Sequence, residues 1–236
     1  MLLKAATIAL IPALIIQGTR VKKNTPRLPE PDGARAGQTG TGTPLSILIV
    51  GDSAAAGVGV STQDDALLGA VIDELKLDFA LDWKLHAQSG DNSRQIIQKI
   101  DALNSCHYDV VLTSVGVNDV TQLMSAKQWI KKQHELYALI QNKFSPKLVI
   151  AAGVPPMHMF PALPNPLSWL FGKYAQQMNQ QLEKFVQEKQ HMQWIEYDLQ
   201  KYRALNLQMA DDGFHPSKEI YQMWGKEVAS IIRQQF

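Results

Sequence analysis

Apolar and polar residues alternate in two different periods from residue 45 to the end of the chain. Short continuous apolar runs of strand length are separated by segments with an apolar residue every three or four positions. A continuous run is typical of a strand buried on both faces of a parallel sheet, and the second spacing is typical of an amphipathic helix. The alternation predicts an α/β fold, a three-layer α/β/α sandwich around a parallel five-stranded sheet. The expected strands are 45–50, 83–87, 108–116, 147–156 and 193–198, and the expected helices are 64–79, 93–103, 125–143, 171–189 and 217–234.

Residues 1–23 form a hydrophobic segment with a basic flank. Fifteen consecutive residues carry no charge, and Arg20, Lys22 and Lys23 follow almost at once. A helix of fifteen residues is about 22 Å long, shorter than the roughly 30 Å hydrocarbon core of a bilayer, and Pro12 would kink it. Three alternatives remain open. The segment is bound to a membrane surface, with the cytoplasmic face favoured by the basic flank, or is an export signal of an exported or periplasmic protein, or is a buried core helix.

Residues 24–44 are rich in proline, glycine and threonine and lack apolar periodicity, which predicts a linker before a domain at 45–236. The first 50 residues carry six basic and two acidic side chains, so the rest of the chain has a net charge of −3 within a total of +1. No overall basic field favours a nucleic-acid partner. A single cysteine, Cys106, excludes an internal disulfide and a cysteine-rich zinc site.

Candidate chemistry lies in the turns at the carboxyl ends of the expected strands, where sites of parallel sheets gather. Ser53 follows the first strand, Gly90 the second and Asn118 the third, and Asp212 and His215 precede the last helix. A serine hydroxyl needs a base such as imidazole, and the imidazole needs a carboxylate that fixes its tautomer. The N–H groups of Ser53 and Gly90, with the amide of Asn118, can bind the oxygen that becomes negative in acyl transfer.

These blocks, GDS at 51–53, glycine at 90, G-x-N-D at 116–119 and D-x-x-H-P at 212–216, resemble those of the SGNH (GDSL) hydrolase family. The resemblance covers about four fifths of the chain and implies a flavodoxin-like sheet. It also implies that Ser53 is the nucleophile, His215 the general base and Asp212 its orienting carboxylate. The implied oxyanion hole consists of Ser53, Gly90 and Asn118. Alanine at position 54 departs from the leucine of the family's usual name, at a position that does no chemistry.

The sequence therefore predicts a metal-independent serine esterase or lipase, without a cofactor, that cleaves carboxylic esters through an acyl-enzyme. Lysophospholipase-like and thioesterase-like activities belong to the same prediction, and the expected partner is a small-molecule or lipid-like ester. The alternatives are a carbohydrate O-acetylesterase and a catalytically silent binding protein of the same fold. The apolar, proline-rich segment 155–171 is expected to form either the wall of an acyl or aryl pocket or a core flap packed on the edge of the sheet.

Two residues beside the expected site are open to confusion with it. Asp52 is adjacent to the proposed nucleophile, so we expect it to brace the turn by hydrogen bonding rather than to orient His215. His158 lies on a loop near the site, and its more ordinary interpretation is a structural or exposed histidine. A dinucleotide fingerprint is absent, since threonine at position 62 breaks the G-x-G-x-x-G pattern.

Overall fold

The computed structural model describes residues 2–195, 197, 204 and 207–236. Its centre is a six-stranded sheet in the order β1-β3-β2-β4-β5-β6, parallel throughout except for the pairing of β1 with β3. The five parallel strands follow the flavodoxin-like order, in which the first strand lies between the second and the third. The strands are β1 (Ala36–Thr39), β2 (Thr43–Gly51), β3 (Phe79–Ala87), β4 (Val110–Ser114), β5 (Leu148–Ala152) and β6 (Met192–Ile195).

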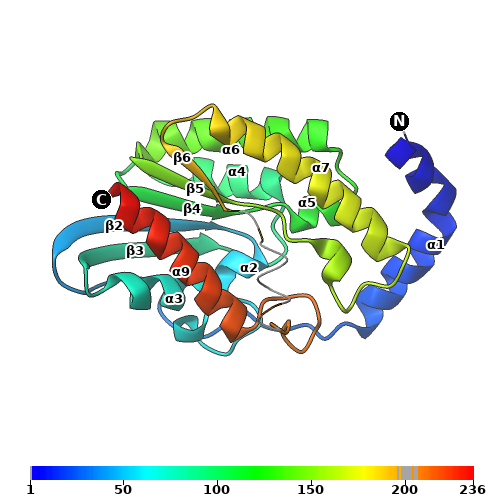
Figure 1. Cartoon of the computed structure of the whole chain (residues 1–236), viewed down its shortest axis with the longest axis horizontal. Coiled ribbons are helices and arrows are strands. Elements are labelled where there is room, and N and C mark those ends of the chain that lie inside the picture. The colour runs from blue at the N-terminus through cyan, green and yellow to red at the C-terminus, as the bar shows by residue number, and fades with distance from the viewer. Residues whose placement is uncertain (1, 196, 198–203, 205–206) are drawn as a thin grey trace.

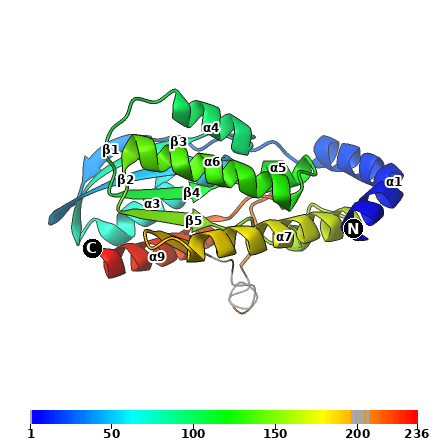
Figure 2. The same ribbon diagram turned by 90° about the horizontal axis from the view of Figure 1, so that it is seen from above.

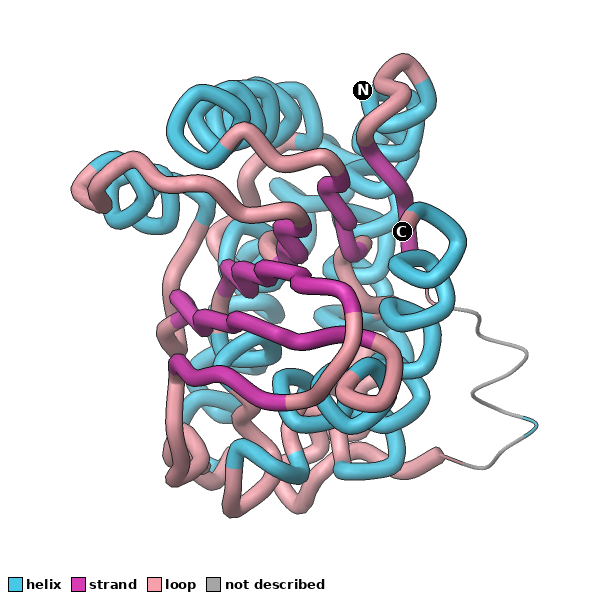
Figure 3. The backbone as a smooth tube through the Cα atoms, turned by 90° about the vertical axis from the view of Figure 1, so that its left-hand side faces the viewer, coloured by secondary structure: helices cyan, strands magenta, loops and turns pink. Residues whose placement is uncertain are grey.

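Helices cover both faces of this sheet (Figures 1 and 3). The sandwich predicted from the sequence is thereby confirmed. The longer helices are α1 (Leu2–Asn24), α3 (Leu67–Leu75), α4 (Ser93–Asp101), α6 (Ala126–Phe144), α7 (Leu167–Gln187) and α9 (Lys218–Gln235). Short helical turns lie near the carboxyl ends of the strands, namely α2 (Ser53–Ala56), η1 (Gln63–Asp65), α5 (Val117–Thr121) and η2 (Met157–Met159).

Successive side chains of β2 point to opposite layers, as the pleat of a strand requires. Leu48 and Val50 pack with buried residues of α4, α6 and α7, whereas Ile47 and Ile49 pack with buried residues of α3 and α9. Every residue of β4 and β5 is buried. A strand covered on both faces needs apolar residues at every position, which is why these strands are continuous apolar runs in the sequence.

The sixth strand, β1, lies within the range predicted as a linker. It pairs antiparallel with β3 at the edge of the sheet, and Gly37 lies so close to Trp83 that a Cβ would come within 2.7 Å of the ring. Most side chains of β1 are exposed. No alternation of apolar and polar residues therefore marks this strand in the sequence, and the sheet has six strands where five were predicted.

Several element boundaries also differ from the sequence prediction, most clearly at the junction of α3 and β3. Helix α3 ends at Leu75 and β3 already begins at Phe79, four residues before the predicted strand. Phe79 is buried in the same cluster as Leu75, so its apolar character fitted the helical spacing equally well. The last predicted strand is present as β6, and residues 196 and 198 of its predicted range lie outside the described residues.

Helix α1 lies against α7 at the end of the molecule toward which the parallel strands point (Figures 1 and 2). Its stretch Ala5–Asn24 is long and apolar enough to cross a membrane by length and composition, and only 6% of this stretch is buried. A core helix would be mostly buried, so the third alternative for residues 1–23 is wrong.

Candidate active site

Ser53 is held at the first turn after β2. Asp52 is the N-cap of α2, with its carboxylate accepting a hydrogen bond from the N–H of Ala54 at 3.2 Å, and the N–H of Asp52 donates to the carbonyl of Ser114 in β4 at 3.1 Å. A Cβ at Gly51 would lie 2.3 Å from that same carbonyl oxygen, so only glycine permits this approach of the two strands. The Asp52 side chain thus braces the turn, as predicted.

The Ser53 hydroxyl is in contact with an imidazole that comes from the far end of the chain. Its Oγ lies 2.9 Å from His215 Nε2, and His215 Nδ1 lies 2.5 Å from Asp212 Oδ2. The other carboxylate oxygen, Oδ1, accepts hydrogen bonds from the N–H groups of Phe214 and His215, both at 2.9 Å. The structure therefore brings Ser53, His215 and Asp212 together in one chain of hydrogen bonds.

The charge on Asp212 is maintained by its partners. Burial alone would raise the pKa of this carboxyl, but the side-chain hydrogen bond from His215 and the two backbone N–H donors outweigh it and lower the pKa below its usual value. The carboxylate, whose side chain is only 1% exposed, is therefore ionised over the neutral range. A buried carboxylate at Nδ1 keeps the Nδ1–H tautomer, which leaves Nε2 free to accept the proton of Ser53.

Gly90 and Asn118 lie on the two sides of this centre. Gly90 has a positive φ of 86° in an exposed turn after β3, with open space where a Cβ would stand. The Asn118 amide, in α5 after β4, donates one hydrogen bond to the carbonyl of Asp91 at 2.9 Å. Since β3 and β4 are the two neighbours of β2, both predicted residues lie on turns next to that of Ser53. One N–H of the Asn118 amide fixes the side chain, and its second N–H can serve a ligand.

A buried network that the sequence analysis missed holds α5 against α4. The carboxylate of Asp119 accepts hydrogen bonds from the N–H and hydroxyl of Ser93, the latter at 2.7 Å, and Gln133 donates to the same hydroxyl at 2.9 Å. All three side chains are buried. Because Asp119 is adjacent to Asn118, this network fixes the Asn118 amide relative to the Gly90 turn. The G-x-N-D pattern contained the signal, but the partner on α4 could not be read from it.

A second missed contact comes from the segment predicted as a linker. Glu30 accepts a hydrogen bond from the N–H of Ser89 at 2.6 Å and forms a 2.9 Å ion pair with Arg35. The guanidinium of Arg35 also donates to the carbonyl of Ala87. Glu30 and Arg35 therefore bind the backbone of residues 87 and 89, directly before Gly90.

The sequence predicts that Gly90 belongs to an oxyanion hole. On that prediction we expect Glu30→Ala to lower the kcat of ester hydrolysis about tenfold with little change in KM, because a misplaced oxyanion donor weakens transition-state binding more than substrate binding. Glu30→Gln retains an oxygen acceptor for the Ser89 N–H and should recover most of the lost rate. Steady-state kinetics on a soluble ester measures both variants. Equal kcat for Glu30→Ala and the unmodified chain would contradict this role.

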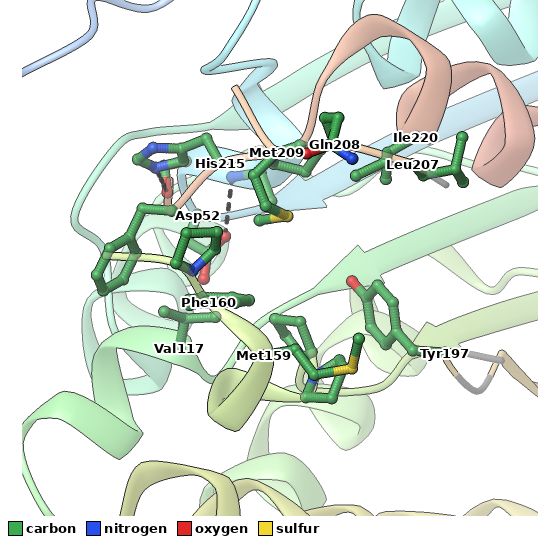
Figure 4. A pocket seen from close by; sticks show the side chains of 17 residues that line it. Asp52, Val117, Met159, Phe160, Tyr197, Leu207, Gln208, Met209, His215 and Ile220 are labelled. Carbon is green, nitrogen blue, oxygen red and sulfur yellow. Dashed lines mark hydrogen bonds between the residues drawn. The ribbon is translucent and has the colours of Figure 1, made fainter. Parts of the chain in front are cut away.

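A cavity of about 350 Å³ opens beside Ser53 and His215. Figure 4 shows Met159 and Phe160 along one side of it and Met209 and Ile220 along another. Pro155, Pro156 and Pro161 also line the cavity. Other residues of the same segment, including Leu163, Leu167 and Leu170, are buried in the core. One part of the segment 155–171 therefore lines the cavity, and another part packs on the core.

His158 lies outside the residues that line this cavity. Its ring packs against α7, where a Cβ at Gly172 would come within 2.6 Å of the His158 side chain. This position agrees with the structural interpretation of His158.

Burial raises the pKa of the Asp52 carboxyl to about 7, although the N–H of Ala54 donates to it. Because this folded-state pKa lies above the ordinary aspartate value of 3.8, the unfolded chain loses the Asp52 proton first, and the stability of the fold falls as pH rises from about 4 to 7. Asparagine keeps the accepting oxygen and has no proton to lose. We expect Asp52→Asn to gain stability relative to the unmodified chain over this range, by up to about 4 kcal/mol at pH 8.

Thermal or urea unfolding at several pH values measures this difference. Asp73→Asn is the matched control, because Asp73 is exposed and pairs only with Lys76 on the surface. If the difference in unfolding free energy between Asp52→Asn and the unmodified chain stayed constant from pH 4 to pH 8, the pKa of the Asp52 carboxyl would be the same in the folded and unfolded chain, and the prediction would be wrong.

The fold places the chain among the α/β proteins, with Ser53, His215 and Asp212 joined by hydrogen bonds at the carboxyl ends of its parallel strands. The family model of the GDSL-like lipase/acylhydrolase family matches residues 49–223, most of the chain, and the protein therefore belongs to this family. The resemblance to the SGNH (GDSL) family is thus confirmed, and the family supports a carboxylic ester hydrolase. No curated protein matches the sequence.

Solved structures share the fold at low sequence identity. A lipolytic protein of the G-D-S-L family from Veillonella parvula has a TM-score of 0.65 at 14% identity, covering 80% of this chain and 99% of its own. A psychrotrophic esterase from Pseudoalteromonas has a TM-score of 0.57 at 21% identity, and the match covers 80% of this chain and 97% of the esterase. A carbohydrate esterase family 2 enzyme from Corynascus thermopiles has a TM-score of 0.61 at 16% identity, and the match covers 84% of this chain and 68% of that enzyme.

Proposed function

We propose that the protein is a serine esterase that cleaves carboxylic esters through an acyl-enzyme at Ser53. The observation that carries this proposal is the chain of contacts from Ser53 Oγ to His215 at 2.9 Å and from His215 to Asp212 at 2.5 Å. Ser53 Oγ attacks the ester carbonyl carbon while its proton passes to His215 Nε2. The tetrahedral intermediate collapses, and His215 returns the proton to the departing alkoxide, which leaves as the alcohol.

The second half of the reaction repeats these steps with water. His215 takes a proton from water, the resulting hydroxide attacks the acyl carbon, and the proton returns to Ser53 Oγ as the acid leaves. Asp212 stabilises the imidazolium in both halves without itself taking the proton. This sequence needs no metal, so we propose that hydrolysis proceeds unchanged in the presence of EDTA.

We assign the oxyanion hole to the N–H groups of Ser53 and Gly90 and to the free N–H of the Asn118 amide. Asn118→Ala should then lower kcat about 10²- to 10³-fold with a smaller effect on KM, because the donor acts mainly on the negative oxygen of the transition state. Asn104→Ala is the control, since Asn104 is an exposed asparagine in the loop after α4. A fall in kcat below threefold for Asn118→Ala would remove it from the oxyanion hole.

The apolar lining of the cavity favours an acyl chain longer than acetyl. Met159, Phe160 and Met209 offer flexible and aromatic surface that an acetyl group could not cover. The alternative, a carbohydrate O-acetylesterase, is supported by the structural likeness to the family 2 carbohydrate esterase. The apolar cavity beside Ser53 is a more direct argument for a longer acyl chain than the likeness is for acetyl, because the cavity is a feature of this chain itself.

A series of p-nitrophenyl esters from acetate to decanoate, with acetylxylan beside it, distinguishes the candidates. The proposal expects kcat/KM to rise from acetate to the medium chain lengths. A maximum at acetate together with release of acetate from acetylxylan would favour the O-acetylesterase. Absence of turnover on every ester, with no labelling of Ser53 by a fluorophosphonate, would indicate the silent binding protein.

A further inference from the structure

One face of helix α1 packs against the rest of the protein. Positions spaced alternately by four and three residues turn toward α7, and Leu14 among them is buried. The Thr7 hydroxyl lies 3.3 Å from the hydroxyl of Tyr174 on α7. Among the described residues, the docked face consists of Leu3, Thr7, Leu10, Leu14, Gln17 and Val21.

Gln17 ties this face to the segment that lines the cavity. Its amide nitrogen donates to the carbonyl of Asn165 at 2.6 Å, and its amide oxygen accepts from the N–H of Leu167, the first residue of α7, at 3.1 Å. Both contacts lie at the end of the segment 155–171. An export signal is cleaved off and does not need side chains that pack on the mature protein. The packing and hydrogen bonds of the docked face therefore favour α1 as a segment that is retained in the folded protein.

A second face of α1, beside the docked one, is apolar and exposed. Ile8, Ile15 and Ile16 are 62–68% exposed and Ile11 is 45% exposed. At 100° per residue, Ile11, Ile15, Ile8 and Ile16 lie about 60°, 100°, 120° and 200° around the helix from Leu14, so they form one continuous arc beside the docked face. Four large aliphatic side chains on one exposed stripe are unusual for a surface in contact with water alone.

The charged residues of α1 itself are all basic. Arg20, Lys22 and Lys23 are exposed at the carboxyl-terminal end of α1, and the first acidic residue of the chain is Glu30. An apolar face flanked by cations matches the layered chemistry of an anionic bilayer surface, where acyl chains lie beneath negative headgroups. A protein partner would need an acidic rim to fit the same charges.

We propose that α1 remains docked on α7 and binds the surface layer of an anionic lipid membrane through Ile8, Ile11, Ile15 and Ile16. Arg20, Lys22 and Lys23 lie among the headgroups. Helix α1 lies at the end of the molecule toward which the parallel strands point (Figure 2), and the cavity opens beside Ser53 at the end of β2. Binding through α1 would therefore hold the cavity close to the bilayer. The inference goes beyond the proposed hydrolysis and does not rest on it.

The test uses the full chain carrying Ser53→Ala, so that the lipid is not consumed and the result is independent of activity. Co-sedimentation is measured with vesicles of phosphatidylcholine, with and without phosphatidylglycerol. We expect binding to the anionic vesicles, lowered about tenfold or more by combined Ile8→Ser, Ile15→Ser and Ile16→Ser. Leu77→Ser is the matched control, because Leu77 is 82% exposed between α3 and β3 and should leave binding unchanged.

The basic residues are tested separately. Combined Arg20→Gln, Lys22→Gln and Lys23→Gln should weaken binding to the anionic vesicles several-fold and remove most of its dependence on salt. Each variant changes exposed side chains only, so we expect the fold to be retained. Circular dichroism and the melting temperature of each variant check this.

Three results would overturn the proposal. The first is failure of the full chain to bind anionic vesicles, or equal binding by the triple serine variant. The second is an amino terminus beyond residue 23 in protein isolated from producing cells, which would identify an export signal. The third is a change from dimer to monomer in the triple serine variant with unchanged vesicle binding, which would assign the stripe to a second copy of the chain.

Discussion

Ser53→Ala is expected to lower the kcat for short p-nitrophenyl esters by a factor on the order of 10⁴ to 10⁶. The variant removes the atom that would form the acyl-enzyme, so turnover would depend on water attacking the bound ester directly. Stability should change little. Ser53 is half-buried, its Oγ contacts the partly exposed His215, and α2 already has alanine at its other three positions.

The measurement combines steady-state kinetics with thermal unfolding. Ser61→Ala is the control, because Ser61 is an exposed serine of the same region without a place in the proposed chemistry. A fluorophosphonate should label the unmodified chain and the Ser61→Ala variant and should leave Ser53→Ala unlabelled. Turnover retained by Ser53→Ala would reject the nucleophile and with it the acyl-enzyme.

The features that the sequence predicted well are those that depend on burial and on strand ends. β4 and β5 are covered by helices on both faces, which imposes a continuous apolar run that few other structures share. The turns after such strands lie on one rim, so residues as distant in sequence as Ser53 and His215 could be expected to meet. Their 2.9 Å contact is the outcome of that topology.

The features that the sequence did not predict depend on contacts between exposed or uniformly apolar segments. Glu30 holds the Gly90 turn across 59 positions of sequence, and neither partner belongs to a periodic pattern. Helix α1 is apolar on all sides, so no periodicity indicated that Leu14 turns inward and Ile15 outward. Its docked face becomes visible only when α7 is beside it.

Asp212→Asn is expected to lower kcat by a factor on the order of 10³ to 10⁴ while the loop keeps its shape. The asparagine oxygen can still accept from the N–H groups of Phe214 and His215, as Asp212 Oδ1 does. Its NH₂ group then faces His215 Nδ1 and donates to it. This donation places the imidazole proton on Nε2, which would point at Ser53 and could no longer accept the hydroxyl proton.

The pH dependence distinguishes this tautomer effect from a general loss of structure. The lowered pKa of Asp212 means that its charge stabilises the fold above its unfolded value and that this contribution is lost only as pH falls through the lower folded value. Asp212→Asn should therefore lose stability relative to the unmodified chain at neutral pH and approach it in strong acid. Raising the pH, which normally favours the free base, should not restore kcat, because the proton lies on the wrong nitrogen.

Asp211→Asn is the matched control, since Asp211 is the exposed neighbour of the buried Asp212. It should retain nearly full activity at every pH. If Asp211→Asn lost activity and Asp212→Asn kept it, the orienting carboxylate would have been assigned to the wrong residue. If both retained activity, the imidazole would be held by its ring contacts alone, and the 2.5 Å contact to Asp212 would serve only the shape of the loop.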